Sequence, residues 1–570
     1  MFDLVIRGGA VVDGSGADRV MADVAVIDGT IAEIGDVEGK AKQVIDANDL
    51  IVAPGFVDVH THYDAQVFWD RHLTPSSLYG VTTVMAGNCG FGLAPLTDTS
   101  GEYLMRMLAR VEGMPLASLQ AGVPWNWKSV DDYFDKVEDN LAVNMGFLIG
   151  HSTLRRYVMG EEANLRVATA AEVASMCELL RDALAAGGLG FSSSRGLAHF
   201  DAEGSPVPSR SADEAELLAL AKVCGEFEGT SLEFMPGDIV GMTEEQVYLM
   251  VAMSSVAKRP LNWNLVRITE ATAEATMGDL RAGTASAERG GKVIALTMPI
   301  PSRARFSFAT GFVLDAIPGW AETMNLSSDQ KLNALRDPST RERLFNASDS
   351  APRFLRELVD WGSKVLTETF SPAMKQFEGR VVSDIARERG TTPFDTLLDI
   401  VCDDNLLTTF SYLPKELTRG DWLVNVGLWE DGRAVIGGSD AGAHLDFTAT
   451  FDYHAYVLEH AVRRHQALSL EAAVHHLCEV PAQLYGLQGR GTIKVGGHAD
   501  VVIFDEEKIE TGQIRTRFDL PGGAARLYSE PSGISYVIVN GEVAVQHGEL
   551  TSATSGSVLR SGRDTTTPSL

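Results

Sequence analysis

The sequence predicts an α/β protein: a (β/α)8 TIM barrel with a small discontinuous β-sandwich domain that both termini form together. Two observations predict this fold. Eight short apolar runs alternate with helical stretches, a pattern typical of parallel strands joined by helices. Strand pairs with hairpin-type turns flank that region at both ends of the chain. The predicted domains are the barrel over 53–484 and the sandwich over 1–52 and 485–555.

Composition and charge limit the class of protein. The chain has 570 residues, of which 45% are hydrophobic and 22% charged, as in ordinary globular proteins. Its 48 basic and 77 acidic residues give a net charge of -29, which argues against nucleic acid or an anionic membrane as partner. The segment Met1–Val5 starts neither a signal peptide nor a membrane span. Five scattered cysteines favour reduced thiols and a cytoplasmic location.

The terminal segments share one β character. Leu4–Arg7 and Val24–Ile27 are short β-type runs, and Gly-Gly and Asp-Gly pairs near them are typical of hairpins. Ala499–Phe504 and Ile534–Val539 have the same character near the other end. Because the N-terminal runs are too few to stand alone, we expect the two groups to form one domain.

The central region contains eight candidate barrel strands, and helical stretches such as Ala170–Ala186 and Asp213–Glu226 separate them. A barrel of this kind carries its active site at the carboxyl ends of its strands. The candidates are Phe56–Val59, Thr82–Ala86, Gly146–Ile149, Leu189–Ser192, Ser231–Phe234, Leu261–Leu265, Val293–Thr297 and Ala434–Gly438.

A long insert separates the last two candidate strands, at about 301–432. Insertions of this length are uncommon in barrels and form lids or substrate pockets, or they form oligomer interfaces. Both interpretations stay open, and so does a homo-oligomeric state. The final residues, 556–570, are polar, and we expect a loosely held tail there.

The first candidate strand ends in two histidines. Side chains alternate between the faces of a strand, so His60 and His62 point the same way. Two imidazoles placed in this way can share one cation, and zinc accepts imidazole nitrogen. Asp64 follows them as a further polar group. The alternative is a pair of exposed loop histidines.

The segment Pro54–His62, Pro-Gly-Phe-Val-Asp-Val-His-Thr-His, resembles the first barrel strand of the amidohydrolase superfamily. Tyr63-Asp64 and the segment Gly87–Gly90, Gly-Asn-Cys-Gly, resemble the N-acyl-D-amino-acid deacylase (D-aminoacylase) branch. The resemblance covers nearly the whole chain and implies the same terminal β domain. It also implies that Cys89 is a metal ligand in place of a carbamylated lysine, and Leu189–Ser194 indeed contains no lysine.

The eighth candidate strand runs into Ser-Asp-Ala-Gly-Ala-His, which resembles the same strand end of the deacylases. The resemblance implies that Asp440 contacts the metal and shuttles the proton of the attacking water. A carboxylate beside a cation suits that role. The alternative is that Asp440 caps a following helix. The predicted centre therefore holds about one zinc per chain, with another divalent metal left open, on His60, His62, Cys89 and Asp440.

Several other polar residues follow the candidate strands and are candidates for substrate binding or support of the centre. His151 is as readily a structural histidine as an orienting one. The serines after the fourth strand suit hydrogen bonding rather than nucleophilic attack, because no His-Asp partner pattern is evident for them. The candidates are Asp64, His151, Ser193, Arg195, Glu233, Asn264 and His444.

The sequence departs from the deacylase pattern at two metal-binding histidines. Glu233 or Phe234 stands roughly at the first position and Asn264 at the second. Asparagine is a weak zinc ligand, so the departure predicts a mononuclear site, with Glu233 as a further ligand or proton carrier.

The groups that hold the substrate carboxylate in the deacylases are also missing. Val266 follows Leu265 where the family has a nearby lysine, and no arginine lies between His444 and Val462. Arginine is the natural partner of a carboxylate, and the substitutes would be Arg267, Arg303 or Arg305.

The sequence as a whole predicts a metal-dependent hydrolase of a C–N bond in a small-molecule amide, similar to N-acyl-D-amino-acid deacylase. Within that class, a cyclic amide of the hydantoin type is the second choice. A non-catalytic binding or scaffold protein is the alternative outside it, since fold alone does not decide function.

Overall fold

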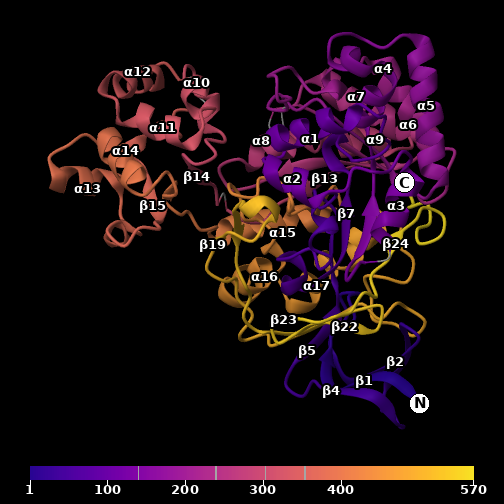
Figure 1. The fold of residues 1–570 in the computed structure, drawn as a ribbon. Coiled ribbons are helices and arrows are strands. Elements are labelled where there is room, and N and C mark those ends of the chain that lie inside the picture. The colour runs from indigo at the N-terminus through magenta and orange to yellow at the C-terminus, as the bar shows by residue number, and fades with distance from the viewer. Residues whose placement is uncertain (139, 238–240, 302, 352–354) are drawn as a thin grey trace.

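The computed structural model describes residues 1–138, 140–237, 241–301, 303–351 and 355–570, and shows a mixed α/β protein (Figure 1). Its strands form a nine-stranded sheet, a six-stranded and a four-stranded parallel sheet, and two small antiparallel sheets. The nine-stranded sheet lies beside the N-terminus, and helices surround the parallel sheets.

Both ends of the chain contribute strands to the nine-stranded sheet. Its order is β23-β22-β21-β18-β5-β1-β2-β3, with β4 paired to β1. The two ends meet where β18 pairs antiparallel with β5, so segments from both termini share one sheet. The strands are β1 (Phe2–Val11), β2 (Val20–Ile27), β3 (Thr30–Gly35), β4 (Ala41–Asp46), β5 (Ile51–Pro54), β18 (Val501–Phe504), β21 (Ile534–Val539), β22 (Glu542–Gln546) and β23 (Glu549–Leu550).

All eight candidate strands of the central region are present, and every pair that they form is parallel. Their buried, β-branched composition is typical of strands covered on both faces. The sheet orders are β17-β13-β12-β11-β10-β9 and β24-β8-β7-β6, and a bridge between Thr61 and Ala441 joins the segments after β6 and β17. The strands are β6 (Phe56–Asp58), β7 (Val81–Ala86), β8 (Asn144–Phe147), β9 (Ile149–Gly150), β10 (Gly190–Ser194), β11 (Ser231–Met235), β12 (Pro260–Val266), β13 (Lys292–Thr297) and β17 (Ala434–Ile436).

The helices begin where the side chains favour it. Thr169, Thr243 and Thr418 each form a capping box that satisfies backbone N–H groups at a helix start. Both helical segments named from the sequence are confirmed, as α5 and α6. The helices outside the insert are α1 (Ser100–Val111), α2 (Leu116–Gly122), α3 (Val130–Glu138), α4 (His151–Met159), α5 (Ala170–Ala185), α6 (Glu214–Cys224), α7 (Glu244–Ala257), α8 (Ala273–Asp279), α9 (Arg281–Ala287), α15 (Arg419–Asp431), α16 (Tyr453–Tyr456), α17 (Leu470–Leu477) and α18 (Glu479–Leu484).

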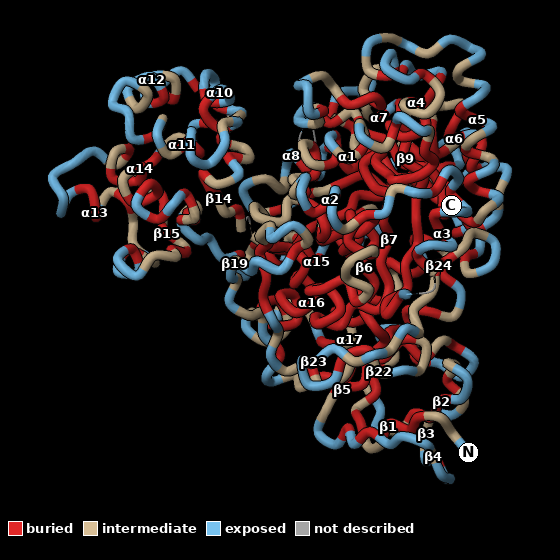
Figure 2. Tube along the Cα trace, in the orientation of Figure 1, coloured by how far each residue is buried: buried red, intermediate tan, exposed pale blue. Residues whose placement is uncertain are grey.

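The insert between β13 and β17 packs around a hydrophobic core of its own, from Ala304 to Phe410. It stands apart from the parallel sheets, and its core forms a separate buried cluster (Figures 1 and 2). Helix α15 instead packs into the main core through Trp422, so the separately packed part ends earlier than Gly432. The insert contains β14 (Arg305–Ser307), β15 (Val365–Glu368), β16 (Thr409–Ser411), α10 (Ala321–Met324), α11 (Ser328–Arg336), α12 (Pro338–Asp349), α13 (Val382–Arg389) and α14 (Pro393–Asp403).

The last residues of the chain are not the loosely held tail that their polarity predicts. Strand β24 (Val558–Leu559) is buried and pairs in parallel with β8. The Thr565 hydroxyl donates to the Gly229 carbonyl over 2.7 Å. The predicted third strand is split, since β8 pairs with β7 whereas β9 pairs with β10. Two apolar residues in a polar stretch therefore fill the sheet edge that this split leaves open.

Within the described ranges, no helix has the length and apolar character that crossing a membrane requires.

Candidate metal centre

His60, His62 and Cys89 come together at the carboxyl ends of β6 and β7. All three are buried, and one potential ligand atom from each lies within 4.8 Å of the others. The two imidazole rings face the same region, with centroids 5.3 Å apart, so the alternation predicted for this strand end is confirmed. Cys89 lies in a turn with a φ of 56° between two glycines that also have positive φ. This turn aims the thiol at the histidines.

Asp440, in the segment after β17, lies beside the two histidines of this group. Its Oδ1 lies 3.1 Å from His62 Nε2 and 3.6 Å from His60 Nε2. The Cys89 Sγ lies 3.6 Å from the same His60 nitrogen. No helix starts at Asp440 in the described chain, since the next helix is α16 at Tyr453. The helix-capping interpretation of Asp440 is therefore wrong.

Buried carboxyl groups surround the four donor atoms. Burial raises the pKa of Glu233 to about 8 and that of Asp64 to about 6. Burial, together with the charges of Glu233, Glu112 and Asp440, raises the pKa of the Cys89 thiol well above its usual range. Burial alone would lower the pKa of His62, but the carboxylates of Glu112 and Asp440 raise it to about 10. Such an excess of buried acidic groups favours a cation at this position.

The turn that carries Cys89 is held by hydrogen bonds on both sides. The Ser192 hydroxyl on β10 donates to the Gly87 carbonyl and accepts from the Gly90 N–H at 3.0 Å. Asp64 Oδ2 accepts from the Gly87 N–H at 3.2 Å. Ser192, which the sequence did not single out, thus supports this turn, and Asp64 supports it from the opposite side.

Glu233 and Asn264 lie beside this group. Glu233 Oε2 accepts from the Cys89 N–H at 2.8 Å, and Oε1 accepts from Asn264 Nδ2 at 2.6 Å. The same amide nitrogen lies 2.7 Å from His60 Nδ1. Phe234 belongs to the apolar core, so Glu233 is the residue of this strand that faces the centre.

A further acidic residue, Glu112, was missed by the sequence analysis. It directly follows α1, and its Oε1 lies 3.7 Å from His62 Nδ1. Its backbone carbonyl accepts from the His444 N–H at 2.5 Å. Nothing in the local sequence marks Glu112 except its place at a helix end before a glycine.

His444 lies at the open side of the centre. Its Nε2 is 3.9 Å from Asp440 Oδ2, and its ring packs at a tilt against Phe312 of the insert with centroids 5.3 Å apart. The insert makes two further contacts here: an ion pair of Arg110 with Asp315 at 3.0 Å, and a hydrogen bond from Thr310 to Asp446 at 2.6 Å.

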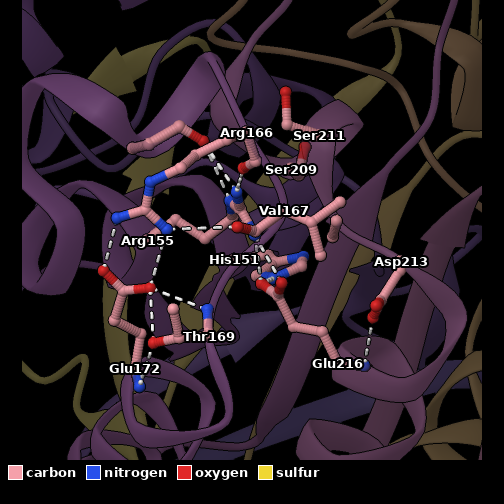
Figure 3. A network of polar contacts seen from close by, with 12 residues as sticks. His151, Arg155, Arg166, Val167, Thr169, Glu172, Ser209, Ser211, Asp213 and Glu216 are labelled. Carbon is pink, nitrogen blue, oxygen red and sulfur yellow. Dashed lines mark hydrogen bonds and ion pairs between the residues drawn. The ribbon is translucent and has the colours of Figure 1, made fainter.

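His151 belongs to a different network of polar contacts (Figure 3), and Ser193 contacts it. His151 Nδ1 lies 2.8 Å from the Ser193 hydroxyl, and Nε2 lies 2.8 Å from Glu216 Oε1. Glu216 also pairs with Arg155. A Ser-His-acid chain thus exists that the sequence did not reveal. Its members are fully buried, and the contacts among them satisfy both ring nitrogens of His151.

Arg195 is also outside the centre. Its Nη2 donates to the Ala212 carbonyl over 3.2 Å. In the part of the chain that the structure describes, no hydrogen bond or ion pair joins Arg195 to the four donor residues.

The three arginines considered as carboxylate partners differ in their surroundings. Arg303 pairs with Asp452, and Arg305 pairs with Glu368 at 3.2 Å. Arg267, after β12, is exposed and has no carboxylate partner among the described residues. Crowding by protein atoms lowers its pKa, and the charge of Asp440 opposes that shift. Arg267 is therefore the one of the three that is available beside the centre.

Comparison with known proteins decides the family. The model of the amidohydrolase family matches residues 43–545, most of the chain. The chain belongs to the amidohydrolase family. Within it, this amidohydrolase lies in the D-aminoacylase-like branch, because such relatives align over nearly its full length.

Two relatives and one solved structure illustrate this. D-aminoacylase from Alcaligenes xylosoxydans xylosoxydans is 27% identical over 565 residues, 98% of this chain and 97% of the relative. N-acyl-D-aspartate deacylase from the same organism is 28% identical over 566 residues, 98% and 95% of the two chains. The structure of N-acyl-D-glutamate deacylase from Bordetella bronchiseptica, complexed with zinc and a phosphonate inhibitor, is 24% identical, with a TM-score of 0.65 and coverage of 98% and 100%.

The residues of this amidohydrolase fit a divalent cation. The imidazole, thiol and carboxylate groups of the four donors are the ligand types that zinc accepts. The His62 Nε2 atom is buried and makes no hydrogen bond of normal geometry, so it is available as a ligand.

Proposed function

We propose that this amidohydrolase hydrolyses the amide bond of N-acyl-D-amino acids with one zinc ion per chain. The observation that carries the proposal is the convergence of the His60, His62, Cys89 and Asp440 donor atoms in a buried, acid-rich site. Its broader class, a metal-dependent hydrolase of C–N bonds other than peptide bonds, follows from its family and from deacylase relatives that span it.

Two relatives that align over 98% of the chain are named D-aminoacylase and N-acyl-D-aspartate deacylase. They favour a linear amide over the hydantoin-type alternative, and catalysis over a binding or scaffold role. We further infer that the two parallel sheets form one closed (β/α)8 barrel, supported by the bridge between Thr61 and Ala441. We also propose that the β unit formed by the two termini is a β-sandwich.

His60, His62, Cys89 and Asp440 would hold the metal. When bound, the cation would polarise the scissile carbonyl and lower the pKa of a water molecule. Asp440 would accept a proton from the attacking water and pass it to the leaving nitrogen. Burial alone would raise the pKa of Asp440, but the neighbouring imidazoles of His60 and His62 lower it well below its usual range. Asp440 is therefore ionised and ready to act as a base at neutral pH.

The proposal of one metal rests on Glu233 and Asn264. In a two-metal centre these positions would supply ligands, but here each is bonded to protein groups. Glu233 holds the Cys89 backbone, and Asn264 lies between Glu233 and His60. We assign them to support of the ligands, with zinc preferred over other divalent metals because of the thiol.

On the substrate side, we assign Arg267 to the carboxylate of the amino acid, since it follows β12, has no carboxylate partner among the described residues and is close enough for the charge of Asp440 to act on its pKa. A guanidinium binds a carboxylate in bidentate fashion. The contacts of Phe312, Thr310 and Asp315 with the catalytic face favour the insert as a pocket wall rather than an oligomer interface. A cytoplasmic location and a homo-oligomeric state stay predictions.

The test is turnover of N-acyl amino acids of both hands by the purified protein and by Asp440→Asn. We expect hydrolysis of the D-enantiomer, and a loss of about 100-fold or more in the variant. The exposed Asp135→Asn serves as matched control. Full activity in Asp440→Asn would contradict the proposed mechanism, and activity on hydantoins alone would contradict the substrate.

A further inference from the structure

We propose that Glu112 is a positioning residue that orients His62 for metal binding. The inference rests on the proposed function, because it concerns the same centre. Glu112 is only 3% exposed, and its Oε1 lies 3.7 Å from His62 Nδ1. The opposite ring nitrogen, Nε2, lies 3.1 Å from Asp440 Oδ1. The imidazole thus stands between two carboxylates, one on the metal side and one behind it.

A histidine that binds a metal needs its ring held in one tautomer, and the position of Glu112 favours that tautomer. One ring nitrogen must be unprotonated toward the cation, so the proton must reside on the other nitrogen. A carboxylate behind the ring favours that tautomer and makes the imidazole a stronger ligand. At 3.7 Å the contact is electrostatic rather than a hydrogen bond, and its effect is large because the pair is buried.

The backbone around Glu112 is fixed, which suits a positioning role. The Glu112 N–H donates to the Leu108 carbonyl at 3.0 Å and so closes helix α1. Its carbonyl accepts from the His444 N–H. The next residue, Gly113, has a φ of +56°, and a Cβ there would lie 3.2 Å from the His444 Cα. The end of α1 is therefore locked to the segment that follows Asp440.

The Nδ1 atoms of His60 and His62 face different chemical groups. Behind His60, the Nδ1 atom faces the neutral amide of Asn264 at 2.7 Å, and Glu233 holds that amide. Behind His62 stands the carboxyl group of Glu112. Replacement of that carboxyl group should therefore weaken the metal site while the His60 side stays intact.

The test compares Glu112→Gln with the full-length wild type and with the exposed Glu102→Gln on the same helix. Zinc affinity is measured by competition with a chelator. We expect about 10- to 100-fold weaker zinc binding in Glu112→Gln, the usual effect of removing such a carboxylate, and wild-type affinity in Glu102→Gln. Cobalt bound to Glu112→Gln should keep its thiolate charge-transfer band, since Cys89 is unchanged.

A second variant separates positioning from folding. Glu112→Asp keeps the carboxylate, so it should recover most of the zinc affinity, and metal-free Glu112→Gln should unfold near the wild-type temperature. Zinc affinity in Glu112→Gln within about twofold of wild type, well under the expected change, would overturn the inference. So would lost turnover at unchanged affinity. Absence of zinc binding by the wild type would instead overturn the proposed function and this inference with it.

Discussion

The strongest prediction about stability concerns the buried carboxylate of Glu216. Its carboxylate accepts from Arg155 Nη1 at 2.6 Å and lies 2.8 Å from His151 Nε2 (Figure 3). All three side chains are fully buried. Glu216→Gln keeps the size of the side chain and removes its charge, so the Arg155 guanidinium would stay buried without a counter-ion.

The size of the effect follows from these contacts. Removing one partner of a buried ion pair costs about 3–5 kcal/mol, because the remaining charge is uncompensated. Arg155 keeps its bonds to the carbonyls of Ala163 and Arg166, at 2.9 and 2.8 Å. We therefore expect a loss near the lower limit, about 3 kcal/mol.

Hydrogen exchange measured by mass spectrometry reports the stability of each segment separately, so it can detect the loss around Glu216. Such a local measurement is needed because a chain of this size is not expected to unfold in a two-state manner. A loss of about 3 kcal/mol corresponds to exchange faster by roughly 100-fold, and we expect it in peptides from α4, β10 and α6. Glu214→Gln, on the exposed side of α6, is the control. The double variant Arg155→Met with Glu216→Gln should recover part of the loss, since no charge stays buried.

The same site predicts a pH dependence. Burial alone would raise the pKa of Glu216, but His151 and Arg155 together lower it below its usual value of 4.5. A lowered pKa stabilises the fold above the unfolded-state value and loses that contribution as pH falls through the folded-state value. Wild type should thus lose protection in α6 only below about pH 4.5, and Glu216→Gln should lack this acid-dependent step. Wild-type exchange rates in Glu216→Gln at neutral pH would refute the assigned role.

Three further predictions concern the centre and one helix. Cys89→Ala should reduce zinc from about one per chain to near zero, measured by elemental analysis; full zinc content would remove Cys89 from the ligand set. Arg267→Met should raise the KM for N-acyl-D-amino acids about 10- to 100-fold, the value of a hydrogen bond to a charged group, with less effect on kcat; an unchanged KM would contradict the carboxylate assignment. Thr169→Ala removes a capping box and should destabilise the start of α5 by about 1 kcal/mol, read as faster exchange in α5 alone.

Patterns and motifs in the sequence were enough to locate the central strands and the four candidate metal ligands. Buried parallel strands need continuous apolar runs, so all eight could be located within a few residues. His60 and His62 share a face because side chains alternate along a strand. Cys89 and Asp440 were found through resemblance, and the structure places both beside the histidines.

Only the tertiary structure decided which distant groups meet. Glu112 reaches His62 because α1 ends beside β6, and no periodic signal marks such a contact. Glu216 on α6 meets His151 at the start of α4, although 65 residues separate them in the chain. Arg267 is distinguished from Arg303 and Arg305 only by the carboxylate partners that those two have. The residues that we propose as metal ligands follow from strand geometry and motif, whereas the residues that we propose to support them depend on contacts between segments far apart in the chain.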